Sequence, residues 1–133
     1  MAARGWPRAL PVRKLGLKLT QMKALSALLI VLWCLLAGLT VYAVSTLGSA
    51  GGAVFFSDFQ HPWRAQFNTD FTLHLLLFIV WVAWREDSRR MGVFWGLLCL
   101  MAGLVTPLYL LLAVYRAHGD PRKLLLGAHA SWI

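Results

Sequence analysis

Three apolar stretches, separated by short polar segments, dominate the pattern of this chain. Residues 24–46 and 92–115 contain no charged side chain, and residues 71–84 form a shorter apolar run between them. About 20 mainly apolar residues, each rising about 1.5 Å along a helix, cross the roughly 30 Å hydrocarbon core of a membrane. The first and third stretches therefore predict transmembrane helices. The middle run predicts one when it is extended to about residues 66–85.

The segments between these stretches divide the chain further. The polar link 85–90 is short enough to make the second and third helices antiparallel neighbours. We therefore predict an all-α membrane protein with three transmembrane helices, of which helices two and three form a tight antiparallel hairpin. Residues 1–23 are predicted to be a basic N-terminal arm, residues 24–115 a three-helix transmembrane domain, and residues 116–133 a short basic tail at the membrane interface.

Composition supports the membrane class, since 59% of the 133 residues are hydrophobic and 14% are charged. The formal net charge of +8 does not indicate nucleic acid, because the basic residues flank the apolar segments instead of following one polar face. Nine of them lie in residues 1–23 and in the link 85–90, whereas four lie at Arg64, Arg116, Arg122 and Lys123. With three spans, the positive-inside rule predicts a multi-pass protein of the bacterial inner (cytoplasmic) membrane, with a cytoplasmic N-terminus and the C-terminus outside.

A cleaved signal peptide is an alternative interpretation of the N-terminal region. A basic start, an apolar run and the small residues Gly48, Ser49 and Ala50 are its ingredients. The apolar run is about 20 residues long, however, and signal peptides have roughly 7–15. An anchor is therefore favoured.

Asp70 and His74 are the candidate ligand-binding pair. Their spacing of four places both side chains on one face of the second helix, and the extended helix carries them into the membrane. Ionisable groups at that depth often mark a ligand or proton site. Thr106, Tyr109 and Tyr42 are expected at the same level, where they would complete a polar pocket. The alternative is that Asp70 caps the helix and His74 makes one interhelical hydrogen bond.

No familiar catalytic motif is present, and His61, His74, His118 and His129 lack the spacing of metal ligands. The sequence thus predicts no catalytic residue, no metal and no cofactor, and favours a non-enzymatic protein. A bound lipid, quinone or pigment remains compatible with the polar pocket.

Helix packing is predicted for a stripe of small residues on the third helix. Gly92, Gly96 and Gly103 recur on one face, and a glycine pair four residues apart lets two backbones approach closely. Pro107 lacks a backbone N–H and so frees the carbonyl of Gly103 for another partner.

Residues 61–115 also resemble a family of small bacterial three-helix membrane proteins classed as a domain of unknown function. The resemblance rests on the following elements of this sequence: His61-Pro62, Phe67, Asp70, Trp81, Arg90-Met91-Gly92, Trp95, Gly103-Leu104 and Pro107-Leu108-Tyr109-Leu110. It implies three spans in the inner membrane and no established activity. It points to Asp70, Gly92, Gly103 and Pro107.

Two functions follow as expectations. The first is a non-enzymatic accessory or interaction subunit that packs against a larger membrane complex, or against itself, through the face of Gly92, Gly96 and Gly103, with membrane lipids as its other partners. The alternative is a protein that binds a lipid headgroup, quinone or polyene, or an intramembrane isomerase, with its pocket in the outer leaflet. A transporter is a third option, although three spans seldom enclose a path.

Overall fold

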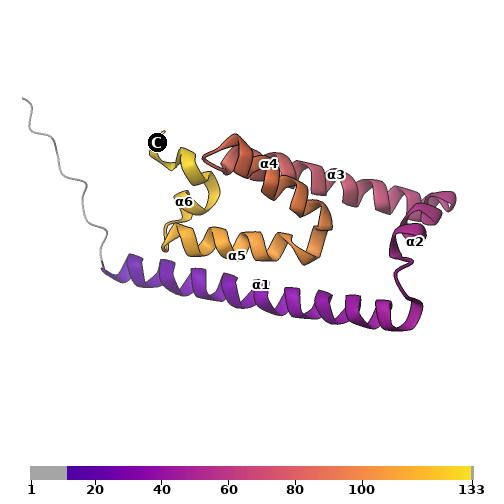
Figure 1. The fold of residues 1–133 in the computed structure, drawn as a ribbon. Coiled ribbons are helices and arrows are strands. Elements are labelled where there is room, and N and C mark those ends of the chain that lie inside the picture. The colour runs from indigo at the N-terminus through magenta and orange to yellow at the C-terminus, as the bar shows by residue number, and fades with distance from the viewer. Residues whose placement is uncertain (1–11, 133) are drawn as a thin grey trace, which may run out of the picture.

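The computed structural model describes residues 12–132, and within that range every regular element is a helix. Short helical turns and non-helical links join the longer helices, and Figure 1 shows their order. The elements are α1 Val12–Leu47, α2 Gly51–Ser57, η1 Asp58–Gln60, α3 Pro62–Arg85, α4 Arg89–Leu98, η2 Cys99–Leu104, α5 Thr106–Ala117, α6 Pro121–Leu126 and η3 Gly127–Trp132.

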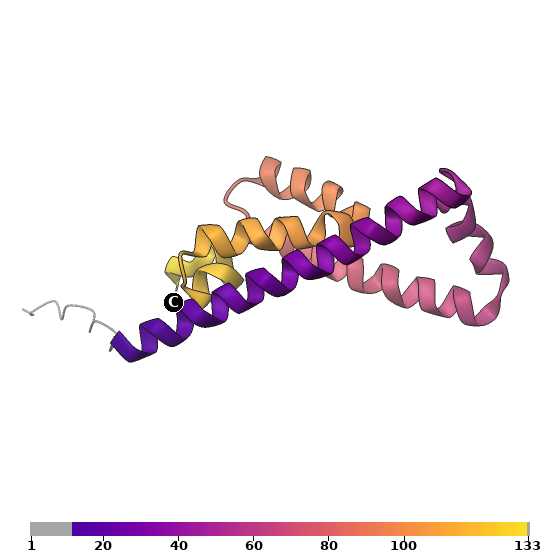
Figure 2. The ribbon, with the colours of Figure 1, turned by 90° about the horizontal axis from the view of Figure 1, so that it is seen from below.

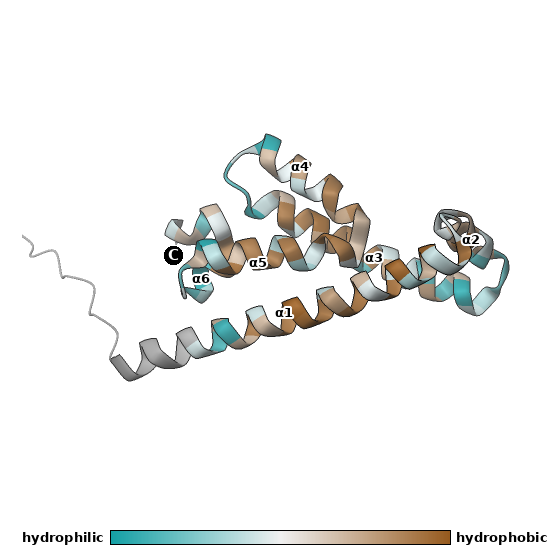
Figure 3. Ribbon diagram, turned by 60° about the horizontal axis from the view of Figure 1, so that its bottom comes forward, coloured by the Kyte–Doolittle hydropathy of each residue, from teal (hydrophilic) through white to brown (hydrophobic). Residues whose placement is uncertain are grey.

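Helices α1 and α3 are the two elements that are long and apolar enough by themselves to cross a membrane. α1 extends over 36 residues and begins inside the predicted N-terminal arm, whose residues 1–11 lie outside the described range. α3 starts at Pro62, where the missing N–H of proline is harmless in the first turn, and the extended backbone of Glu86 ends it. Figure 3 shows the apolar middle of α1 and the polar links at the ends of these helices.

The third apolar stretch is not the single helix predicted over residues 92–115. α4 passes into η2, the chain turns at Ala102 (φ 49°, ψ −124°), and α5 departs at 120° from the preceding helix. Pro107 explains the break in part, because a proline inside a continuous helix would clash with the carbonyl of Gly103. α5 begins at Thr106 instead, with proline in its first turn. Residues 12–132 thus contain two candidate spans, or three if the bent pair counts as one.

The bent pair folds back toward the end at which it starts. Figures 1 and 2 show α4 beside α3 and α5 beside α1, so that α5 lies between the two long helices. Trp33 of α1 donates a hydrogen bond to the carbonyl of Leu104 near the turn, at 2.9 Å. The buried centre contains Val82, Cys99 and Tyr109, one residue from each of α3, η2 and α5.

The small-residue stripe packs inside the chain. A methyl group at Gly92 would lie 2.6 Å from the carbonyl oxygen of Ala83 in α3, and one at Gly96 would lie 3.2 Å from Ile79. A methyl group at Gly103 would collide with Leu36 of α1. The chain's own helices therefore occupy the face that the sequence suggested for an outside partner.

The C-terminal tail turns back at Gly119 and covers the end of α3. His129 donates from Nε2 to the carbonyl of Trp84 at 2.8 Å, and Nε of Arg85 donates to the carbonyl of Leu124 at 2.7 Å. Sequence analysis had placed the link 85–90 inside and the tail outside. In the structure the tail instead contacts the residues that open this link.

Candidate functional site

A buried arginine organises the end of the molecule where the tail meets α3. Arg85 is 3% exposed and is the last residue of α3. Besides Leu124, its guanidinium donates to the carbonyl of Lys123 at 3.2 Å and to the hydroxyl of Tyr109 at 3.1 Å. One side chain therefore joins α3 to α5 and α6.

Glu86 supplies the compensating charge. Its side chain is 7% exposed, and Oε1 accepts a hydrogen bond from the Tyr109 hydroxyl at 2.8 Å while Oε2 accepts from Arg116 at 3.3 Å. Arg85 lies 3.5 Å from the same carboxylate. Buried charges are tolerated when they are paired and hydrogen-bonded, as they are here. We call Arg85, Glu86, Tyr109 and Arg116 the Arg85 cluster.

Aromatic rings enclose the cluster from the apolar side. The guanidinium carbon of Arg85 lies 5.6 Å from the ring centre of Trp81 and 5.7 Å from that of Tyr109, distances at which cation–π attraction operates. Trp81 also donates to the carbonyl of Leu125 at 3.1 Å. The tail is thus attached to α3 by backbone carbonyls that accept hydrogen bonds from two α3 side chains.

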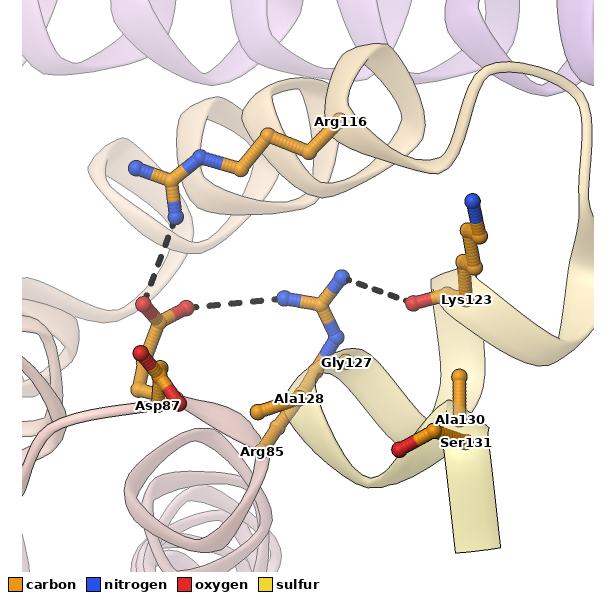
Figure 4. Close-up of a pocket in the computed structure, with 9 residues that line it drawn as sticks. Arg85, Asp87, Arg116, Lys123, Gly127, Ala128, Ala130 and Ser131 are labelled. Carbon is orange, nitrogen blue, oxygen red and sulfur yellow. Dashed lines mark hydrogen bonds and ion pairs between the residues drawn. The ribbon is translucent and has the colours of Figure 1, made fainter. Parts of the chain in front are cut away.

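A cavity of about 380 Å³ opens beside the Arg85 cluster. Figure 4 shows the residues that line it, which come from the end of α3, from α5 and from the tail. They are Arg85, Glu86, Asp87, Arg116, Lys123, Gly127, Ala128, Ala130 and Ser131. The cavity combines fixed charges with small side chains that leave room for a ligand.

The Asp70–His74 pair lies on a different part of α3 and faces outward. Nδ1 of His74 is 3.5 Å from the Asp70 carboxylate and 2.8 Å from the Asp70 carbonyl. The side chains are 74% and 58% exposed for His74 and Asp70 respectively. The structure therefore forms the predicted contact but does not cover it with another part of the described chain.

The other predicted ligand-binding residues are divided between two places. His74 and Thr106 line a second cavity of about 320 Å³, together with Gly103 and Pro107 at the turn of the bent pair. Tyr109 belongs to the Arg85 cluster instead, and Tyr42 is exposed on α1. The predicted five-residue polar layer is thus not assembled.

Sequence analysis missed the burial and clustering of Arg85 and Glu86, which it treated only as charges in a link. A signal was present in the turn sequence Gly119-Asp120-Pro121, which sends the tail back along α5. The missing information was the bend at Ala102, without which the tail cannot reach α3.

Comparison with known proteins gives no match: no family model, curated protein or solved structure is significantly similar to this chain. The resemblance of residues 61–115 to a family of three-helix membrane proteins stays a prediction. Among residues 12–132, no group of three His, Cys, Asp or Glu side chains is placed to hold a metal ion.

Proposed function

We propose that this chain is a non-enzymatic, multi-pass subunit of a bacterial inner membrane that packs against another membrane protein through the face of α3 that carries Asp70 and His74. The observation that supports it is the exposure of these two ionisable side chains on a helix long enough to span a membrane.

Depth makes this exposure significant. A span of 24 residues is about 36 Å long, some 6 Å more than the roughly 30 Å hydrocarbon core. Asp70 lies eight residues after Pro62, about 12 Å along the helix, and so about 9 Å below the hydrocarbon surface. Ionisable groups at such depth face protein or a wet cavity. A partner helix that offers hydrogen-bonding side chains satisfies that requirement.

The partner surface consists of Asp70, Leu73, His74 and Leu77, which share one face of α3 and are all exposed. It replaces the glycine stripe suggested by the sequence, because that stripe packs within the chain.

Charge distribution supports a specific orientation. Ten of the eleven Lys and Arg residues between 12 and 132 lie near the start of α1, in the link 85–90 or in residues 116–123, which share one end of the molecule. Arg64 alone lies at the other end of the described chain. By the positive-inside rule this end is cytoplasmic, so the start of α1 and the C-terminal tail are both cytoplasmic and α4 to α5 is a re-entrant pair.

Photo-crosslinking tests the proposed partner surface. A photoreactive residue at Leu77 (70% exposed) is expected to give one saturable adduct in native membranes, and one at Val41 of α1 (68% exposed) serves as the matched control. The adduct should disappear in the D70N/H74A double variant. Adducts that are equal at both positions, or unchanged in the double variant, would contradict the proposal.

The cavity beside His74 supports a second function, the binding of a lipid, quinone or polyene, or its isomerisation. Its apolar lining and its single hydroxyl at Thr106 match a hydrophobic ligand with one polar end. Replacing Thr106 by valine should release such a ligand and leave the Leu77 adduct intact, whereas D70N/H74A removes the adduct.

A further inference from the structure

The cavity at the Arg85 cluster contains two opposite charges that do not neutralise each other. Among the side chains of residues 20–131, neither the carboxylate of Asp87 nor the ammonium of Lys123 has a hydrogen bond or an ion pair, although both line the cavity. Figure 4 shows the two side chains on either side of the Arg85 guanidinium. An anionic and a cationic position are thus both available to a ligand.

Arg116 adds to the cationic side. It is 45% exposed and uses Nη1 to bind Glu86, so its remaining N–H groups are free to donate toward the cavity. Glu86, by contrast, is 7% exposed and already accepts from Tyr109 and Arg116. Asp87 is therefore the carboxylate that can receive a cation from outside.

The cavity lies at the level of the lipid headgroups. α3 ends at Arg85, and its last turns carry Trp81 and Trp84, residues that prefer the membrane–water interface. The tail that forms the other wall presents the exposed apolar side chain of Leu125 and the charged side chain of Lys123. Lipid can therefore reach the cavity laterally from the bilayer.

We propose that this cavity binds the headgroup of a phospholipid that carries both a phosphate and a primary ammonium, as phosphatidylethanolamine does. The phosphate accepts hydrogen bonds from Lys123 and Arg116, and the ammonium donates to Asp87. Phosphatidylcholine lacks the N–H donors, and phosphatidylglycerol lacks the positive charge. The inference requires that the chain span a membrane and that the tail contact Arg85, and it is independent of the protein partner proposed at Asp70.

Native mass spectrometry of the purified full chain tests this selectivity. The chain is titrated with phosphatidylethanolamine, phosphatidylcholine and phosphatidylglycerol of identical acyl chains. We expect ethanolamine lipid to be retained about two- to fivefold better than choline lipid, the factor that a partly exposed ion pair provides. Equal retention of all three lipids would overturn the proposal.

Matched variants identify the two charged positions. D87N should abolish the preference for ethanolamine over choline, whereas D70N, the same change in the first half of α3, should preserve it. K123Q should weaken the binding of all three lipids about two- to fivefold, and R122Q, whose side chain does not line the cavity, should not. An unchanged preference in D87N would overturn the assignment.

A competition experiment distinguishes a membrane lipid from a water-soluble ligand that has the same phosphate and ammonium groups. Free phosphoethanolamine is added as a competitor to the chain bound to the ethanolamine lipid. Displacement only at a large excess supports the lipid, because the acyl chains add apolar contacts. Displacement at an equimolar concentration would overturn the lipid and identify a soluble ligand instead.

Discussion

Arg85 at the end of α3 and Tyr109 in the first turn of α5 are joined by a hydrogen bond of 3.1 Å, although 24 residues separate them in the sequence. The same hydroxyl donates to Glu86 at 2.8 Å. Tyr109 therefore bridges a buried cation and a buried anion, and this bridge forms only because α5 returns toward the end of α3. The contact couples the bend at Ala102 to the docking of the tail.

Arg85→Ala tests how much the cluster stabilises the fold. Its removal leaves Glu86 with one cationic partner and frees two tail carbonyls, so we expect a loss of about 3 to 5 kcal/mol in the free energy of unfolding. Denaturant titration in detergent measures this loss. Arg64→Ala is the control, because Arg64 pairs with Asp58 while 65% exposed and should contribute at most about 1 kcal/mol. Equal effects of the two variants would contradict a special role for Arg85.

Tyr109→Phe isolates the bridging hydroxyl while keeping the ring. Hydrogen bonds to charged groups contribute about 1.5 to 3 kcal/mol. We therefore expect the free energy of unfolding, measured in detergent, to fall by that amount. Tyr115→Phe should leave stability unchanged because that side chain is 75% exposed. An unchanged free energy of unfolding in Tyr109→Phe would mean that water replaces the hydroxyl without loss.

The sequence was sufficient to predict the helical membrane class, because a long uncharged apolar run inside a membrane must satisfy its own backbone hydrogen bonds, and a helix does so. It also predicted the contact between Asp70 and His74, because residues four apart are neighbours on the surface of any helix. The bend at Ala102 could not be predicted in the same way, because residues 92–115 are uniformly apolar and long enough for one span. Pro107 was noticed, but whether a proline kinks a helix or starts a new one depends here on packing against α1 and α3.

The Arg85 cluster could not be predicted from the sequence for the same reason. Charges next to an apolar run predict topology, whereas their burial depends on which distant segment covers them. That segment is the tail, which reaches Arg85 only after the turn at Ala102 has redirected α5.

Gly92→Ala tests the internal use of the glycine stripe. The added methyl group would lie 2.6 Å from the carbonyl oxygen of Ala83, so α4 must move away from α3. We expect a loss of about 1 to 3 kcal/mol in the free energy of unfolding, as overpacked helix contacts show. Gly38→Ala in α1 has open space around it and should be neutral or slightly stabilising. A neutral Gly92→Ala would instead leave the stripe available for an outside partner.

Thiol labelling tests whether the C-terminus shares a side of the membrane with the start of α1. Ser131→Cys should react with an impermeant reagent only from the cytoplasmic side, because the tail contacts α3 next to the basic link. Ser57→Cys, at the other end of the molecule, should react only from outside. The native thiols do not interfere, since Cys34 lies in the apolar part of α1 and Cys99 is buried. If Ser131→Cys reacts from outside together with Ser57→Cys, then residues 92–115 cross the membrane as one helix, the tail cannot contact Arg85, and both the re-entrant pair and the headgroup cavity are wrong.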